Sequence, residues 1–274
     1  MLNANGRVSL NNGGNGYDWQ VEYRRHTVSA QVVKPQFFKV PNPNSTINKE
    51  VVRDITNFEG RNYIQNKIVT FMDNNLIANK KYAKELFSKM KPLKKWWWSQ
   101  VSIDITKDKE LMRLAAESGC ISVFVGIETF SQESLKNMGK HQNKISEYKK
   151  AINTFHEYGI YVIASLIIGF DEDTVESIRK IPEIVQDLDI DIPYLNILTP
   201  YYGTNIFDQY TRENRILTKN WSHYNAFNAV FQPKNMSVDE LHSTYMEIWK
   251  EIHSIKNTFK RVFKNIPIPI SGYP

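Results

Sequence analysis

A glutamate closes one of the most apolar runs of this sequence. The run covers residues 121–129 (ISVFVGIET), follows Gly119 and carries Glu128 near its end. A run this short and this rich in Val, Ile and Phe predicts a parallel strand that is covered on both faces. Ligands of parallel sheets bind beyond the carboxyl ends of the strands, so a carboxylate at this position is suited to binding. An N-cap or an ion-paired rim residue is the structural alternative.

Polar groups also close four other apolar runs. Alternation over 97–104 places Gln100, Ser102 and Asp104 on one face of a strand. Gly169 would let a ligand approach the backbone closely, while Asp73 and Asp171 have an alternative role as caps of the helices that follow. The strand-end groups are Asp73, Asn74, Asn75, Gln100, Ser102, Asp104, Glu128, Gly169, Asp171, Asn196 and Thr199. This set predicts a small ligand with amine, carboxylate and hydroxyl groups, bound at the carboxyl rim of the sheet.

Regular alternation of apolar runs and helical patterns predicts the elements that carry these groups. Strands are expected at 67–72, 97–104, 121–129, 161–169 and 194–199, and helices at 80–90, 107–118, 144–158, 174–188 and 238–260. Strand and helix in alternation indicate right-handed βαβ units and a parallel sheet, and this order fits a partial α/β barrel.

The amino-terminal stretch differs from the rest. Residues 1–16 are rich in Asn and Gly, a composition that buries little apolar surface, and we expect a flexible leader there. One strand near 26–33 and a short amphipathic helix at 49–58 are expected before the regular alternation begins.

Composition predicts a soluble globular protein, with 41% hydrophobic and 23% charged residues. No apolar stretch reaches the roughly 18 to 20 residues that span a bilayer, and the first residues lack the basic start and apolar core of a secretion signal. We therefore expect no membrane contact and a cytoplasmic location. The net charge of +6 favours acidic or phosphate-bearing partners.

A lysine-rich stretch, residues 80–95, leads into the triple tryptophan 96–98. Basic groups beside aromatic side chains can hold nucleic acid. The alternative, a solvated helix face that leads into a buried strand, is the favoured interpretation, so nucleic-acid binding is not expected.

Four segments resemble the radical S-adenosylmethionine (SAM) superfamily, in the class that is often joined to a cobalamin-binding domain. They read IVTFMDNNLIANKKYAKELF, WWSQVSIDITKDKELMRLAAESGCISVFVGIET, SLIIGFDEDTVESI and NILTPYYGTNIF. The later text ILTKNWSHYNAFNAVFQPKNMSVDELHSTYMEIW resembles the uncharacterised domain that follows the core in that class. The resemblance divides the chain into a leader (1–46), a barrel (47–204) and an accessory C-terminal region (205–274).

The resemblance implies a partial (β/α)6 barrel, with a mixed, mostly helical C-terminal extension, that holds SAM against a 4Fe-4S cluster. It places Asp73 to Asn75 near the methionine amine and Ser102 with its neighbours at the methionine carboxylate. It places Glu128 at the ribose and the backbone of Ile167 to Gly169 at the adenine. In the family, reductive cleavage of the sulfonium yields a 5′-deoxyadenosyl radical, a reaction that belongs to the cofactor.

The sequence departs from the family where the cluster should be bound. The family's motif is Cys-x-x-x-Cys-x-x-Cys after the first strand, because iron-sulfur clusters require thiolate ligands. The corresponding region, residues 24–38, reads RRHTVSAQVVKPQFF and contains no cysteine. The single cysteine, Cys120, precedes the third strand and is expected to be an ordinary buried residue. One thiol forms neither an intramolecular disulfide nor an all-cysteine metal site.

Three functional hypotheses follow. The first is a radical SAM core that lacks its cluster ligands and is therefore inactive or truncated as it stands. The second is a regulatory module that retains SAM recognition without catalysis. The third is a basic protein that binds nucleic acid or another partner. Loops and appended domains set the substrate in this superfamily, so the core residues name none.

Overall fold

The computed structural model describes residues 6–13, 16–23, 68–141 and 143–264, and describes side chains within 68–261. The chain divides into two compact units, residues 1–36 and 37–274. The strand expected at 26–33 and the helix expected at 49–58 lie outside the described residues.

The described part of the first unit is a β-hairpin. β1 (Gly6–Gly13) pairs antiparallel with β2 (Gly16–Tyr23), and Leu10 stands opposite Trp19. Residues 6–13 lie in the stretch expected to be a flexible leader, and here they form a strand. In this register Val8 also stands opposite Val21.

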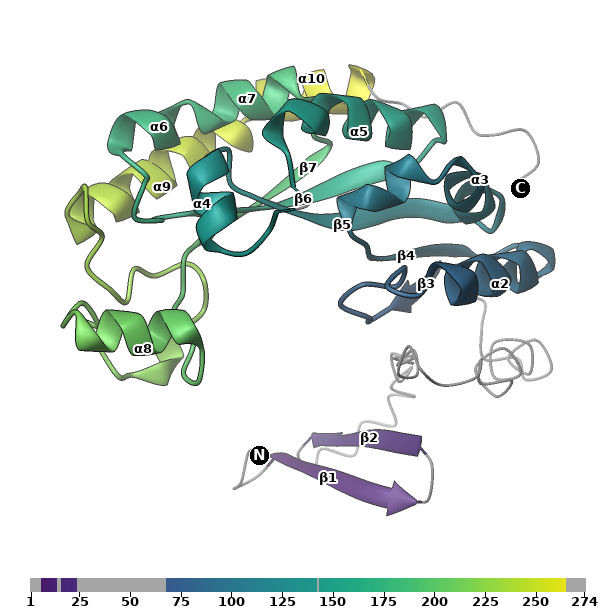
Figure 1. Ribbon diagram of the computed structural model, residues 1–274, viewed down its shortest axis with the longest axis horizontal. Helices are drawn as coiled ribbons and strands as arrows, with labels where there is room; N and C mark the ends of the chain where they lie inside the picture. Colours follow the sequence, from purple (N-terminus) through teal and green to yellow (C-terminus); the bar gives the residue numbers. More distant parts are fainter. Residues whose placement is uncertain (1–5, 14–15, 24–67, 142, 265–274) are drawn as a thin grey trace. The chain divides into compact units, whose positions relative to one another are not determined.

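The described part of the second unit is built on five parallel strands that neighbour each other in chain order. They are β3 (Ile68–Phe71), β4 (Trp96–Gln100), β5 (Cys120–Glu128), β6 (Tyr161–Ile168) and β7 (Ile192–Ile197). Helices follow the strands, and Figure 1 shows α5, α6 and α7 along one side of β6 and β7. The predicted α/β class with a parallel sheet is confirmed.

The described helices are α2 (Lys80–Met90), α3 (Lys109–Glu117), α4 (Gln132–Asn137), α5 (Ile145–Glu157), α6 (Val175–Arg179), α7 (Ile181–Asp187), α8 (Asn205–Arg212), α9 (Val238–Ile252) and α10 (Ile255–Lys264). Short 3-10 helices are η2 (Lys91–Leu93), η3 (Ile103–Lys107) and η4 (Trp221–His223). No described helix is both long and apolar enough to cross a bilayer.

Three elements end where the sequence did not predict. The strand expected at 97–104 ends at Gln100, because the chain turns into η3, whose buried Ile103 and Ile105 imitate the alternation of a strand. The helix expected at 174–188 divides at Lys180, since Pro182 has no N–H to continue the hydrogen-bond ladder. The last helix divides between α9 and α10 at residues 253–254.

The two faces of the sheet differ in burial. On the helix side Trp97 is fully buried, stacks on Phe87 at a centroid distance of 4.9 Å and donates its indole N–H to Ser118 at 3.0 Å. The opposite face, here called the inner face, carries Gln100, Phe124, Gly126, Ile163, Ser165, Ile192 and Tyr194 in register. Ile192 and Tyr194 remain 50% and 46% exposed. The described residues therefore leave the inner face open enough to meet a ligand.

Candidate ligand-binding rim

Glu128 ends β5 in a β-bulge that turns its carboxylate over the inner face. Gly126 pairs with Ser165 and Glu128 with Leu166, so Ile127 is the extra residue in β5. Glu128 has a φ of 72°, a left-handed conformation that costs a non-glycine residue about 1 to 3 kcal/mol. A Cβ atom on Gly126 would lie 3.2 Å from Cδ of Glu128 and closer still to its Oε1. The carboxylate can lie across the strand because residue 126 is glycine.

Side chains from the segment after β5 hold this bulge. Asn143 Nδ2 donates to the carbonyl of Gly126 at 2.9 Å, and the Tyr148 hydroxyl donates to the carbonyl of Ile127 at 3.0 Å. Burial raises the pKa of Tyr148, so the hydroxyl remains a donor at neutral pH. The ammonium of Lys140 pairs with Glu128 Oε1, and the Glu128 side chain is 12% exposed. Sequence reasoning missed these supporting residues, because no local pattern marks a side chain that bonds to a distant carbonyl.

A second polar group forms where β3 and β4 end. Asn75 Nδ2 donates to Ser102 Oγ at 3.2 Å, and the Ser102 backbone N–H donates to Asn75 Oδ1 at 3.1 Å. The Ser102 hydroxyl in turn donates to Asp104, which lies 3.4 Å from the ammonium of Lys80. These side chains are half-buried. The structure therefore brings Asn75, Ser102 and Asp104 together. Ser102 and Asp104 lie at the start of η3, whereas the sequence placed them on one face of a strand.

The other predicted polar residues at the ends of β3 and β4 are sequence neighbours of Asn75 and Ser102. Asp73 and Gln100 are half-buried and Asn74 is exposed, and the carbonyl of Gln100 accepts from the backbone N–H of Leu76 at 3.0 Å. Asp73 does not cap the following helix, because the N-cap of α2 is Asn79. The capping alternative for Asp73 was therefore wrong.

The next groups lie at the ends of β6 and β7: Ile167 and Gly169, expected beside the adenine, and the strand-end residue Thr199. Ile167 is half-buried and pairs in register with Asn196, and Thr199 donates to the carbonyl of Ile197 at 3.1 Å. Gly169 has a φ of 96°, and a Cβ there would lie 3.1 Å from a methyl carbon of Leu241. The room that this glycine leaves is therefore taken by α9 rather than left open for a ligand.

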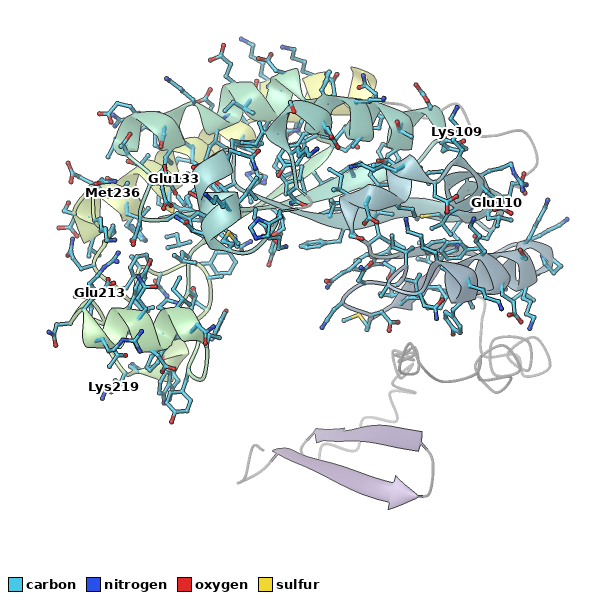
Figure 2. The ribbon with its side chains drawn as sticks, in the orientation of Figure 1. Lys109, Glu110, Glu133, Glu213, Lys219 and Met236 are labelled. Atoms are coloured by element: carbon cyan, nitrogen blue, oxygen red, sulfur yellow. The ribbon has the colours of Figure 1, made fainter. Side chains whose placement is uncertain are left out.

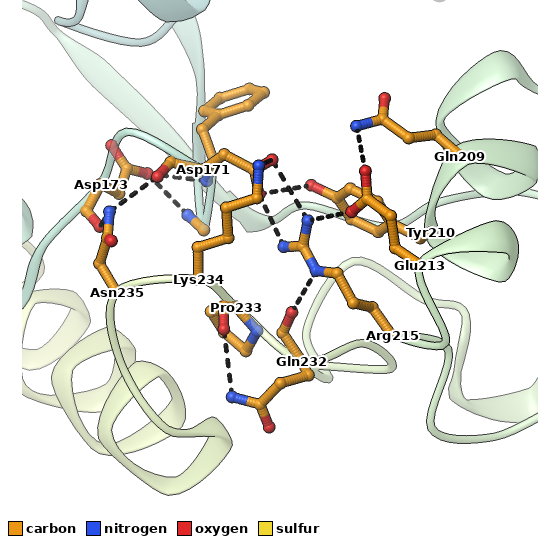
Figure 3. A network of polar contacts seen from close by, with 12 residues as sticks. Asp171, Asp173, Gln209, Tyr210, Glu213, Arg215, Gln232, Pro233, Lys234 and Asn235 are labelled. Atoms are coloured by element: carbon orange, nitrogen blue, oxygen red, sulfur yellow. Dashed lines mark hydrogen bonds and ion pairs between the residues drawn. The ribbon is translucent and has the colours of Figure 1, made fainter.

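An ionic network at the end of β6 was not predicted (Figure 3). Arg215 donates to both carboxylate oxygens of Asp171 at 3.2 and 2.6 Å, and Lys234 lies 2.7 Å from the same carboxylate. Burial alone would raise the pKa of Asp171, but the hydrogen bonds and charges of Arg215 and Lys234 hold it below its usual range. The N-cap of α6 is Thr174, so the capping alternative for Asp171 was wrong too. The network joins the sheet to the C-terminal region.

The neighbouring carboxylate, Asp173, is buried in the same corner. Its Oδ2 accepts the backbone N–H groups of Gly169 and Phe170 at 2.8 and 3.0 Å. Burial raises the pKa of Asp173 to about 6, and the two backbone hydrogen bonds oppose that rise. Asn235 donates to the backbone carbonyls of Asp171 and Asp173, so the turn after β6 is fixed from both sides.

Among the described residues, no set of thiolates is available to hold an iron-sulfur cluster. Cys120 is 5% exposed at the amino end of β5, and its thiol faces the carbonyl of Ser122 at 3.5 Å. Burial raises the pKa of this thiol, which disfavours the thiolate that a metal requires. Among the residues that the structure describes, no group of three or more His, Cys, Asp or Glu side chains is arranged to hold a metal ion.

Acidic neighbours neutralise much of the lysine-rich stretch. Lys84 pairs with Asp108 at 3.1 Å and with Glu110 at 2.6 Å, and Lys91 pairs with Glu117 at 3.0 Å. These contacts link α2 and the residues after it to α3, and α2 leads into the strand of the buried Trp97. The arrangement agrees with a solvated helix face rather than a nucleic-acid surface.

Two family models match this chain. The model of the Radical SAM superfamily matches residues 34–184, and a domain of unknown function, DUF4070, matches residues 204–268.

The named relatives are methyltransferases and cyclases. Bacteriochlorophyllide d C-12(1)-methyltransferase of Chlorobaculum tepidum is 27% identical over 193 residues, which are 70% of this chain and 42% of that protein. Hopanoid C-2 methylase of Rhodopseudomonas palustris is 30% identical over 155 residues, which are 54% of this chain and 29% of that protein. The chain thus spans less than half the length of these curated relatives.

Solved structures share the fold. The methyltransferase TsrM from Kitasatospora setae, a radical SAM enzyme solved with cobalamin and a 4Fe-4S cluster, superposes with a TM-score of 0.54 at 15% identity. The match covers 74% of this chain and 40% of TsrM. Because the superfamily model covers more than half of the residues and the parallel sheet has the corresponding architecture, the chain belongs to the radical SAM superfamily.

Proposed function

We propose that the carboxyl rim of this chain binds SAM, and that the chain assembles no 4Fe-4S cluster of its own. The observation that carries the proposal is Glu128. A glutamate in a left-handed conformation, with its carboxylate laid across a glycine on the inner face of the sheet, is a costly arrangement for a non-glycine residue. Strain of this kind occurs most often at sites that bind or react.

The chemistry of Glu128 suits the ribose of SAM. A carboxylate accepts hydrogen bonds from two neighbouring hydroxyl groups, and such charge-assisted bonds are strong where water is largely excluded. The Glu128 side chain is 12% exposed, and its ion pair with Lys140 limits its motion. The carboxylate is therefore oriented before a ligand arrives.

The second polar group suits the amino-acid end of SAM. Asn75 and Ser102 offer amide and hydroxyl groups that can bond a carboxylate or an ammonium, and Asp104 adds a negative charge. Their mutual hydrogen bonds hold the set in one arrangement. The two polar groups lie at the ends of β3, β4 and β5, which are adjacent strands, so one elongated ligand can contact both.

The cysteine content of the chain does not support a 4Fe-4S cluster. A 4Fe-4S cluster in this family needs thiolates, and the chain has one cysteine, which is buried at the opposite end of β5. A SAM-binding module without catalysis of its own is the function that the residues support.

Isothermal titration calorimetry with SAM tests the proposal. Glu128→Ala and Ser102→Ala should each weaken binding about 10-fold or more, since a hydrogen bond to a charged group contributes about 1.5 to 3 kcal/mol. Glu247→Ala is the matched control, because Glu247 is an exposed carboxylate paired with Arg179 on the helix side. Absence of any heat with the wild-type chain, or equal affinities for all four proteins, would refute the proposal.

A further inference from the structure

The C-terminal region carries a set of contacting aromatic rings, two of them facing solvent. Tyr202, Phe207, Trp221 and Tyr224, here called the aromatic platform, touch in series. The Tyr202 centroid lies 5.4 Å from that of Phe207 and 5.9 Å from that of Trp221, and the Trp221 centroid lies 4.9 Å from that of Tyr224. Tyr202 is 77% exposed and Trp221 is 52% exposed.

The two exposed rings rest on a buried base. Phe207 and Tyr224 are 6% and 8% exposed, and the Tyr224 hydroxyl donates to the carbonyl of Thr218 at 2.7 Å. Thr204 caps α8 and so fixes the helix that carries Phe207. The exposed rings are therefore held in a set orientation, with the planes of Tyr202 and Trp221 crossing at 67°.

The segment that carries the platform leaves and rejoins the sheet at the carboxyl end of β7. The chain runs from Ile197 through residues 198–204 into α8 (Figure 1). It returns at Ala226, whose carbonyl accepts the backbone N–H of Ile197 at 2.7 Å. Phe227, next to this contact, is 46% exposed. The segment that carries the platform thus begins at the carboxyl end of β7, the same end of the sheet at which Glu128 closes β5 and Asn75 follows β3.

The charge beside the platform is positive. Lys219 and His223 flank Trp221 in the chain and are exposed, and Lys219 lies beside α8 (Figure 2). Lys219 forms no ion pair with another described residue. Of the acidic groups in and after α8, Glu213 is paired with Arg215, and Asp208 is exposed on the helix.

We propose that the aromatic platform binds a planar, apolar ring system that bears an acidic group. Two exposed rings fixed edge to face present one flat ring face together with a neighbouring edge, an arrangement that an aromatic ligand extends by stacking. The unpaired ammonium of Lys219 is complementary to a carboxylate on such a ligand. The site lies outside the residues proposed for SAM, so it adds a second ligand to the rim and does not depend on SAM binding.

A lipid surface is the competing occupant, because Tyr and Trp are also frequent at membrane interfaces. Membrane docking, however, relies on a helix with a continuous apolar face or on clusters of several basic residues. The platform offers a rigid ring pair with one lysine, Lys219, nearby in the chain instead. A compact ring ligand fits it better.

Titration with protoporphyrin IX, a planar ring with two carboxylates, tests the proposal. Binding is followed by the shift of the porphyrin absorbance band in the full chain. Trp221→Ala and Tyr202→Ala should each weaken binding about 10-fold, since each removes one stacking face and its buried area. Trp249→Ala is the matched control, because Trp249 is 41% exposed on α9 and stacks on His253 instead. It should leave the affinity unchanged.

Charge is tested separately. Lys219→Glu should weaken binding of protoporphyrin IX several-fold, and a tetracationic porphyrin should bind wild type much more weakly than protoporphyrin IX does. Equal affinity of all variants, including Trp249→Ala, would show non-specific adsorption and overturn the proposal. Absence of porphyrin binding, together with sedimentation on phosphatidylglycerol vesicles that Trp221→Ala abolishes, would replace it with a membrane surface.

The same variants separate this proposal from SAM binding. Trp221→Ala should retain the calorimetric signal for SAM, and Glu128→Ala should retain porphyrin binding. Far-ultraviolet circular dichroism and thermal unfolding establish that each variant is folded. Loss of both ligands in a folded Trp221→Ala variant would contradict two independent sites.

Discussion

Replacing Gly126 by alanine should displace the Glu128 carboxylate while leaving the fold intact. The new Cβ would lie 3.2 Å from Glu128 Cδ and 3.2 Å from Lys140 Nζ, and closer than either to Glu128 Oε1. All of these atoms belong to flexible side chains, so the carboxylate must swing away. Gly126 is not among the residues with positive φ, so alanine adopts its backbone without strain.

The effects on stability nearly cancel. Alanine in place of glycine at an unstrained position stabilises by about 0.4 to 1 kcal/mol through the unfolded chain. Loss of the partly exposed pair between Glu128 and Lys140 costs about 0 to 1 kcal/mol. The free energy of unfolding in urea should therefore change by less than about 1 kcal/mol.

The effect on SAM affinity is larger. Loss of a hydrogen bond to the carboxylate costs about 1.5 to 3 kcal/mol, which is about 10- to 100-fold in Kd. A double-mutant cycle with Glu128→Ala tells displacement of the carboxylate apart from a general disturbance of β5. Once the carboxylate is removed, Gly126→Ala should cause no further loss of SAM affinity. Additive losses in the double variant, or unchanged affinity in Gly126→Ala, would refute the reasoning.

Three further predictions concern stability. Because burial raises the pKa of Asp173 to about 6, the folded chain takes up a proton that the unfolded chain does not, and stability should rise as pH falls from 6 toward 4. In the Asp173→Asn variant, the unfolding free energy measured with urea should differ less between pH 6 and pH 4 than it does in the wild type. Among the described residues, Arg215→Ala leaves the half-buried Asp171 with Lys234 as its one charged partner, and it should lower the unfolding free energy by about 3 kcal/mol. Trp97→Phe leaves a cavity in place of the fully buried indole. It should lower the unfolding free energy by about 1 to 3 kcal/mol, seen as a lower midpoint temperature in thermal unfolding.

The alternation of strands and helices was predictable because each apolar run has a clear period and length. The predicted helix at 80–90 has the bounds of α2, and a carboxylate at the end of β5 lies on the rim as expected. The end of β4 was not predictable from alternation, since the buried Ile103 and Ile105 of η3 fit a strand pattern equally well.

Long-range side-chain contacts were the part that the sequence could not supply. Arg215 and Asp171 are 44 residues apart, and no periodicity links two charges at that separation. The β-bulge was equally hidden, because its supports, Asn143 and Tyr148, bond to backbone carbonyls rather than to a complementary side chain. The one local signal in the sequence was Gly126, two positions before Glu128. Its role, to leave room for the carboxylate, can be inferred only from the structure of the bulge.

Anaerobic iron-sulfur reconstitution followed by SAM titration of the same sample tests the central claim most directly. SAM should bind equally before and after reconstitution, and the chain should retain no more iron and sulfide than a Cys120→Ser variant. A content of about four irons and four sulfides per chain, with 5′-deoxyadenosine formed on reduction, would contradict it.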